Sequence, residues 1–76
     1  MIVMITSDYY NEYELYKTED LSDIENSLKT YFETGVYEMD PGKHELIGSQ
    51  DTIDTDDAIE TADKILYIDD YDPEWN

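Results

Sequence analysis

Residues 2–6 read IVMIT, an apolar run that ends in a threonine. A continuous apolar run of this length is typical of a β-strand that is covered on both faces. No basic residue precedes it, acidic residues begin at Asp8, and the run is too short to cross a membrane, so we expect neither a signal peptide nor a membrane span. The run therefore predicts a strand in the core of the fold.

The next apolar segment is YELYKT at residues 13–18, which alternates and is rich in residues that favour strands. The turn-like SDYYNE at residues 7–12 separates it from the first strand. This pattern predicts a β-hairpin.

A second hairpin is predicted farther along the chain. VYEM (36–39) and HELI (44–47) flank DPGK (40–43), in which a proline and a glycine suit the central positions of a turn. ILYI (65–68) resembles a final buried strand.

The stretch LSDIENSLKTYFET at residues 21–34 has the strongest helical pattern. Ser22 and Glu25 fit a capping box, and Gly35 stands where a helix C-terminal glycine is common. Apolar residues recur at helical spacing at Leu21, Ile24, Leu28, Tyr31 and Phe32. We expect one firm helix here.

A shorter helix is predicted at about residues 55–63. It follows the acidic stretch DTIDTDDAIE (51–60), in which Asp54, Thr55 or Asp57 can cap the helix. Acidic residues in the first turn suit the positive end of the helix dipole. The whole chain, residues 1–76, is expected to be a single α+β domain with four or five short, mostly antiparallel strands.

The charge is the most unusual property of the chain. Twenty-one acidic residues stand against four lysines and no arginine, for a formal net charge of −17. Eight tyrosines and many isoleucines supply a core, so we expect a folded domain and not a disordered acidic tail. Self-repulsion should make salt stabilising. A halophilic origin is the alternative, but abundant isoleucine and tyrosine are not its usual bias.

Known catalytic and metal-binding patterns do not fit. An EF-hand loop that starts at Asp51 has Ile53 at its third position, and one that starts at Asp54 has Ala58 at its fifth. The chain has no cysteine and one histidine, His44, which we interpret as a surface residue of the second hairpin. We therefore expect no enzyme activity, no cofactor and no specific metal site, although clustered carboxylates bind cations weakly.

The tyrosines divide into two predicted sets. Tyr31 and Tyr67 are expected in the core. The others considered lie among acidic residues, namely Tyr9, Tyr10, Tyr13, Tyr16 and Tyr71. Aromatic residues interleaved with acids would repel nucleic acid but suit a protein contact, because tyrosine supplies contact area while carboxylates meet lysine and arginine.

Charge density points to a class of partner. A compact chain of this length is about 29 Å across, and about 29 Å of duplex DNA carries roughly 17 negative charges. The chain carries a net charge of −17. A protein that normally holds DNA would therefore meet a similar total charge.

In size, acidity, lack of cysteine and Tyr/Asp pairings such as SDYYNEYE (7–14) and IDDYDPEW (68–75), the chain resembles the small DNA-mimic proteins of bacteriophages and mobile elements. These include inhibitors of restriction enzymes, of uracil-DNA glycosylase, of CRISPR nucleases and of the nucleoid protein HU. The resemblance is one of composition and implies a mode of action, not a fold. It implies a host-takeover or anti-defence inhibitor whose partner is a basic DNA-binding host protein, with HU the first choice.

The predicted mechanism is competition, in which carboxylates occupy the sites of DNA phosphates. The main set is Asp51, Asp54, Asp56, Asp57, Glu60, Asp63, Asp69, Asp70, Asp72 and Glu74, extended by Glu19, Asp20, Asp23 and Glu25. We expect no direct binding to nucleic acid or membrane and a cytoplasmic location, and a homodimer would match the symmetry of dimeric HU. The alternatives are a small Ca²⁺-binding module and an acidic adaptor for another basic protein.

Overall fold

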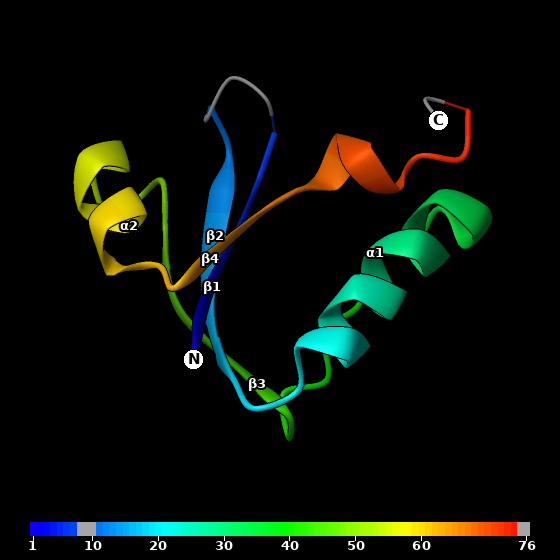
Figure 1. The fold of residues 1–76 in the computed structure, drawn as a ribbon, viewed down its shortest axis with the longest axis horizontal. Coiled ribbons are helices and arrows are strands. Elements are labelled where there is room, and N and C mark those ends of the chain that lie inside the picture. Colours follow the sequence, from blue (N-terminus) through cyan, green and yellow to red (C-terminus); the bar gives the residue numbers. More distant parts are fainter. Residues whose placement is uncertain (8–10, 75–76) are drawn as a thin grey trace.

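The computed structural model describes residues 1–7 and 11–74, which form a small α+β domain (Figure 1). Its principal extents are 31 × 29 × 19 Å. In chain order the elements are β1 (Ile2–Thr6), β2 (Tyr13–Thr18), α1 (Leu21–Thr34), β3 (His44–Ser49), α2 (Thr55–Thr61), β4 (Lys64–Tyr67) and the 3₁₀ helix η1 (Ile68–Tyr71). The predicted α+β class is confirmed.

The four strands form one mixed sheet in the order β3-β2-β1-β4. Strand β1 pairs with β2 in antiparallel fashion, as the predicted first hairpin requires, and its other edge pairs with β4 in parallel fashion. Val3 and Met4 of β1 are fully buried and point to opposite faces. The prediction of a strand covered on both faces is therefore confirmed.

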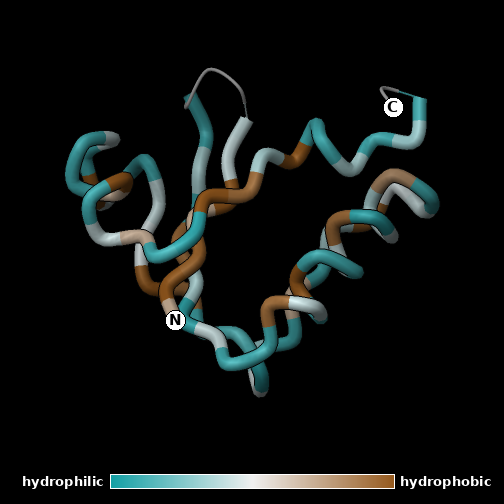
Figure 2. The backbone as a smooth tube through the Cα atoms, viewed as in Figure 1, coloured by the Kyte–Doolittle hydropathy of each residue, from teal (hydrophilic) through white to brown (hydrophobic). Residues whose placement is uncertain are grey.

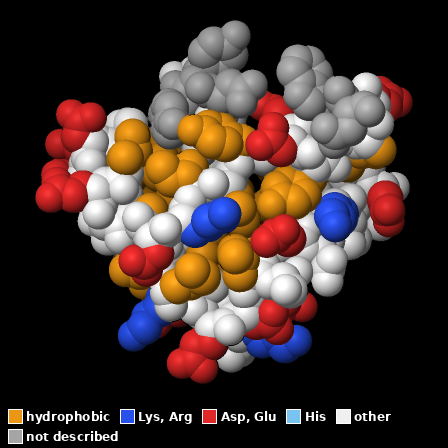
Figure 3. All heavy atoms as spheres, viewed as in Figure 1, with side chains coloured by type: hydrophobic (Ala, Val, Ile, Leu, Met, Phe, Trp, Pro, Cys, Tyr) orange, Lys and Arg blue, Asp and Glu red, His pale blue; other side chains and the backbone are white. Residues whose placement is uncertain are grey.

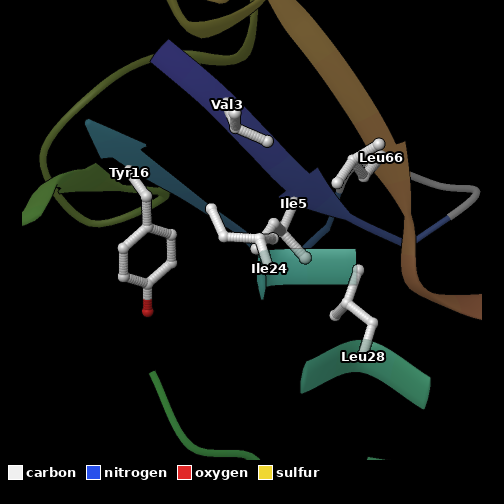
Figure 4. Packing of buried hydrophobic residues seen from close by; sticks show 6 residues of the cluster. All are labelled: Val3, Ile5, Tyr16, Ile24, Leu28 and Leu66. Carbon is white, nitrogen blue, oxygen red and sulfur yellow. The ribbon is translucent and has the colours of Figure 1, made fainter. Parts of the chain in front are cut away.

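Each face of the sheet is covered by one helix. On the α1 face, Ile24 and Leu28 of the helix pack against Val3, Ile5 and Leu66 of the strands (Figure 4). On the α2 face, Ala58 packs against a cluster made by Met4, Tyr13 and Leu15. Figure 2 shows that the hydrophobic residues of α1 lie on the side that faces the strands. The sheet thus separates two small cores.

Helix α1 has the predicted bounds but a different cap. Asp20 is the N-cap, and its Oδ1 accepts a hydrogen bond from Asp23 N at 3.1 Å. The predicted Ser22–Glu25 capping box is wrong because the N-cap lies two residues earlier, at Asp20, and the helix begins at Leu21. Gly35 ends the helix with φ of 75°, and its N–H donates to Tyr31 O at 2.7 Å, as the C-terminal glycine predicts.

Helix α2 is two residues shorter than predicted and ends at Thr61. Ala62 is already extended, and Asp63 is tied to β1 by two bonds: its N–H donates to Ile2 O and its Oδ2 accepts from Ile2 N, both at 2.8 Å. This attachment fixes where the chain enters β4, so the helix cannot continue. Asp54 takes the N-cap position without a side-chain cap bond.

The second hairpin was predicted wrongly. Residues 36–40 form no strand, and β3 pairs with β2 instead. A turn does form at the predicted place, since Lys43 N and His44 N both donate to Asp40 O, at 3.0 and 2.9 Å. The segment before the turn packs its apolar side chains, Tyr37 and Met39, onto the α1-face core. Burial of these side chains takes the place of strand pairing.

Strand β3 forms an edge of the sheet and contains an irregularity. Leu15 lies opposite Gly48, whereas Tyr16 lies opposite Leu46, so Ile47 is an extra residue in the pairing. Leu46 and Ile47 remain 54% and 39% exposed. Such a bulge twists an edge strand and hinders the pairing of another strand with it.

Candidate partner-binding surface

Most of the predicted acids around the second helix lie on the side of the sheet that α2 covers, whereas Asp51, which follows β3, also lines a cleft on the α1 face. We call these residues the α2 group; they are Asp51, Asp54, Asp56, Asp57, Glu60 and Asp63. All six are exposed. Helix α2 buries only Ala58 fully, so the rest of its surface is free to carry charge.

The acids of the C-terminal segment lie on the other side, beside α1. The 3₁₀ helix η1 contacts α1, and Tyr71 packs onto the α1-face core (Figure 1). Burial raises the pKa of the Tyr71 hydroxyl, and the neighbouring Glu25 and Asp70 raise it further. We call the acids of the C-terminal segment, together with those at the start of α1, the α1–tail group. Its members are Glu19, Asp20, Asp23, Glu25, Asp69, Asp70, Asp72 and Glu74.

The structure does not place the predicted carboxylates on one continuous track. Strand β4 leads from the α2 side to the α1 side, so the acids of α2 and those of η1 are separated by the sheet (Figure 1). None of the fourteen is buried. Figure 3 shows acidic side chains around the outline of one view, with hydrophobic atoms exposed between them.

Besides Asp63, whose carboxylate accepts from Ile2 N, two others of the fourteen acids have structural tasks that the charge pattern did not reveal. Asp20 caps α1. Asp23 binds His44, with 2.7 Å between Oδ2 and Nε2, and lies 3.7 Å from the Lys43 Nζ through Oδ1. The hydrogen bond to His44, aided by the Lys43 charge, lowers the pKa of the Asp23 carboxyl.

His44 is a buried residue, so the prediction of a surface histidine is wrong. Its side chain is 2% exposed and joins two elements: Nδ1 lies 2.7 Å from Thr18 Oγ1 of β2, and Nε2 bonds Asp23 of α1. Thr18 Oγ1 also accepts from Asp20 N at 2.9 Å. The charged neighbours Lys43 and Glu45 gave no sign of this network, because the partners of His44 are distant along the chain.

The tyrosine predictions are partly wrong. Tyr13 and Tyr16, assigned to a partner contact, are core residues that are 4% and 6% exposed. Their hydroxyls reach polar partners: Tyr13 Oη donates to Ile53 O, and Tyr16 Oη donates to Glu14 Oε2 at 2.9 Å. A tyrosine can therefore enter the core while its hydroxyl stays hydrogen-bonded.

The remaining tyrosines have intermediate positions. Tyr31 and Tyr67, predicted in the core, are half-buried, as is Tyr71. Tyr9 and Tyr10 lie outside the described residues. Among the described tyrosines that were predicted to contact a partner, only Tyr71 is exposed enough to do so.

A cleft of about 450 Å³ opens at one end of the α1 face, where β1 ends and β2 begins. Ile5, Leu46 and Ile68 contribute apolar side chains, and Tyr31 and Tyr37 contribute rings. Glu12, Glu14 and Asp51 also line it. Only Asp51 of these belongs to the predicted set. The alternation of YELYKT already places Glu14 on the face of Tyr16, which is the one sequence signal that could have identified it.

Within residues 1–7 and 11–74, no group of three or more His, Asp or Glu side chains is arranged to hold a metal ion. In the same residues, no helix combines the length and apolar character needed to span a membrane. Comparisons with protein-family models, curated proteins and solved structures give no match for the chain.

Proposed function

We propose that the protein is a DNA-mimic inhibitor, which binds the DNA-binding surface of a host protein and blocks its access to DNA. The observation that carries the proposal is that all fourteen predicted acids remain at least partly exposed on a body 31 Å long with a net charge of −17. About 31 Å of duplex carries roughly 18 phosphate charges. A groove built for duplex DNA would meet a similar charge over a similar length.

The placement of the two acidic groups favours a target that grips DNA from more than one side. The nucleoid protein HU is our first choice, because proteins of its class hold DNA through backbone charge and minor-groove arms with little base readout. Apart from Asp51, the α2 group lies on the opposite side of the sheet from the α1–tail group (Figure 1). Each group can then meet a different basic surface of the target.

The remaining features of the proposal follow from the same charge. A surface this acidic repels nucleic acid and anionic lipid, so the partner is a basic protein of the host bacterial cytoplasm. A homodimer would present two equivalent copies of each acidic group to a dimeric target. The dimer is an additional feature that competition with DNA does not require.

The direct test uses purified HU dimer bound to a fluorescent DNA duplex. Added protein should displace the duplex and lower its fluorescence anisotropy, with an inhibition constant that weakens steeply as salt concentration rises. Undiminished DNA binding at saturating protein would reject HU as the target. The same assay with a restriction enzyme, a CRISPR nuclease or uracil-DNA glycosylase then tests the related inhibitor functions.

Two matched quadruple variants locate the contact. One is D54N/D56N/D57N/E60Q in the α2 group and the other is D69N/D70N/D72N/E74Q in the α1–tail group. Each variant neutralises three aspartates and one glutamate, so the two variants change the net charge equally. The variant at the contact should weaken inhibition by about tenfold or more.

The two alternatives give different results in separate measurements. Calorimetric titration with Ca²⁺ at physiological salt should show a defined stoichiometry if the protein is a Ca²⁺-binding module. An acidic adaptor would retain basic host proteins that DNA does not displace. Either result, together with failure to compete with DNA, would replace the inhibitor proposal.

A further inference from the structure

The cleft on the α1 face combines an apolar floor with an acidic rim. Its floor includes Ile5, Leu46 and Ile68, which come from two strands and from the start of η1. Leu46 is 54% exposed, although it lies opposite the buried Tyr16 on the same face of the sheet. An apolar side chain is therefore left uncovered at a place where its neighbours are packed.

Three carboxylates from separate segments stand around this floor. Glu12 precedes β2, Glu14 lies within it, and Asp51 follows β3. Glu14 is held by the hydrogen bond from Tyr16 Oη. No lysine is among the described residues that line the cleft, so the rim attracts a cation that the chain itself does not supply.

The two tyrosines of the cleft add a second, independent feature. The rings of Tyr31 and Tyr37 meet edge to face, with centroids 5.8 Å apart and an interplanar angle of 89°. The hydroxyl oxygen of Tyr37 is buried beside the Tyr16 hydroxyl. Burial raises the pKa of this hydroxyl, and the neighbouring Tyr16 and Glu14 raise it further, so it stays neutral. The two rings give the cleft an aromatic wall on which a planar cation can stack.

We propose that this cleft receives an arginine side chain of the partner protein. A guanidinium group is planar and weakly hydrated, stacks on aromatic rings, and donates to carboxylates in a fork geometry. Its aliphatic stem would cover Leu46 and Ile68 while its head meets Glu12, Glu14 and Asp51. A lysine ammonium is more strongly hydrated and stacks less well, and a purely apolar side chain would leave the carboxylates without a partner.

The identity of the partner rests on the proposed function, but arginine binding by the cleft does not. If the cleft binds arginine and the protein fails to displace DNA from HU, the inference stands and the inhibitor proposal fails for that target. If the protein displaces DNA but the cleft does not bind arginine, the inhibitor acts through its acidic groups alone.

The experiment is a titration of the isotope-labelled protein with N-acetyl-arginine amide, followed by nuclear magnetic resonance. Saturable shifts should be concentrated at Tyr31, Tyr37, Leu46 and Ile68. The uncharged citrulline analogue should bind at least about tenfold more weakly, because it lacks the charge that the carboxylates recognise. The corresponding lysine amide should bind less tightly than the arginine probe.

A pair of triple variants distinguishes the cleft from the general acidity of the surface. E12Q/E14Q/D51N neutralises the rim, whereas E33Q/E38Q/D40N removes the same three charges from exposed residues outside the cleft. The rim variant should weaken binding of the arginine probe by about tenfold or more, and the control by no more than about twofold.

The variant Y37L removes one ring of the aromatic wall and keeps an apolar side chain there. It should weaken binding of the arginine probe by about threefold or more, and the same spectra show whether the variant is folded. The proposal is overturned if both triple variants weaken binding equally, if the citrulline analogue binds as tightly as arginine, or if the shifts spread over the acidic surface without saturating.

Discussion

The two helices cover opposite faces of one sheet, yet they are held in different ways. Helix α1 has fourteen residues, a side-chain N-cap from Asp20, a left-handed glycine at its end and a buried histidine that joins it to β2. Helix α2 has seven residues, no side-chain cap bond and one fully buried residue, Ala58. Most of the specific attachments are therefore on the α1 face.

Because of this difference, substitutions on the α1 face should mainly change stability, and substitutions on the α2 face should mainly change the surface charge. On the α1 face, a polar network around buried His44 joins the start of the helix to the sheet, so changes there should act on folding. On the α2 face, a short helix exposes three acids together with Ile59 and Thr61, so changes to its acids should act on electrostatics. Acidic residues repel one another on both helices, but α1 is better stabilised against this repulsion by its N-cap, its C-terminal glycine and His44.

The largest expected effect comes from the α1 core. L28A removes a fully buried side chain and should cost about 2–5 kcal/mol, a large share of the stability of a domain this small. On α2, I59A alters a residue that is 38% exposed and should cost less than about 1 kcal/mol. Urea denaturation of both variants measures the difference, and equal losses would contradict the comparison.

The buried histidine should have the next largest effect. H44A leaves Thr18 and Asp23 without their partner and should cost about 1–3 kcal/mol. E45Q, at the neighbouring exposed position, serves as the control and should change the free energy of unfolding by less than about 0.5 kcal/mol. A value for H44A as small as that of E45Q would mean that the network does not stabilise the fold.

The two N-caps give a direct comparison of the helices. D20A removes an observed cap hydrogen bond and should cost about 1 kcal/mol. D54A removes an aspartate that makes no such bond and should cost only a few tenths of a kcal/mol, mainly through the helix dipole. Thermal unfolding of both variants measures the costs, and a reversed order would refute the assignment.

The smallest effect concerns the pH dependence of Asp23. Its folded-state pKa lies below the ordinary value of 3.8, so its contribution to stability is present above that value and is lost as pH falls through the folded pKa. D23N should therefore be less stable than the parent near neutral pH, and the gap should close in strong acid. Comparing the two proteins cancels the general relief of repulsion as other carboxylates protonate, and a gap independent of pH would contradict the prediction.

Regular elements were predictable where periodicity and local chemistry agreed. IVMIT, YELYKT and residues 21–34 each combine a clear pattern with suitable flanking residues, and each forms the expected element. Residues 36–39 were predicted as a strand and form none, because Tyr37 and Met39 pack on the core instead of pairing with another strand. Local sequence does not show which neighbour a short apolar segment will meet.

The candidate site was predictable in composition and not in arrangement. The exposure of the acids followed from their number, but the path of the chain through the sheet decides that Asp57 of α2 and Asp69 of η1 lie on different sides. The cleft escaped prediction because Glu12, Tyr37 and Ile68 are far apart in the chain and meet only in the folded protein. Buried His44 escaped it for the same reason.

The parallel pairing of β1 with β4 also affects how the chain folds. Val3 lies opposite Lys64, so β1 is synthesised well before its second neighbour β4. Contacts between such distant residues slow folding, and the unpaired edge of β1 favours aggregation until β4 pairs with it. The hairpin with β2 protects only one edge of β1 during this interval. Repulsion among the many acidic side chains would then keep nascent chains apart until β4 closes the sheet.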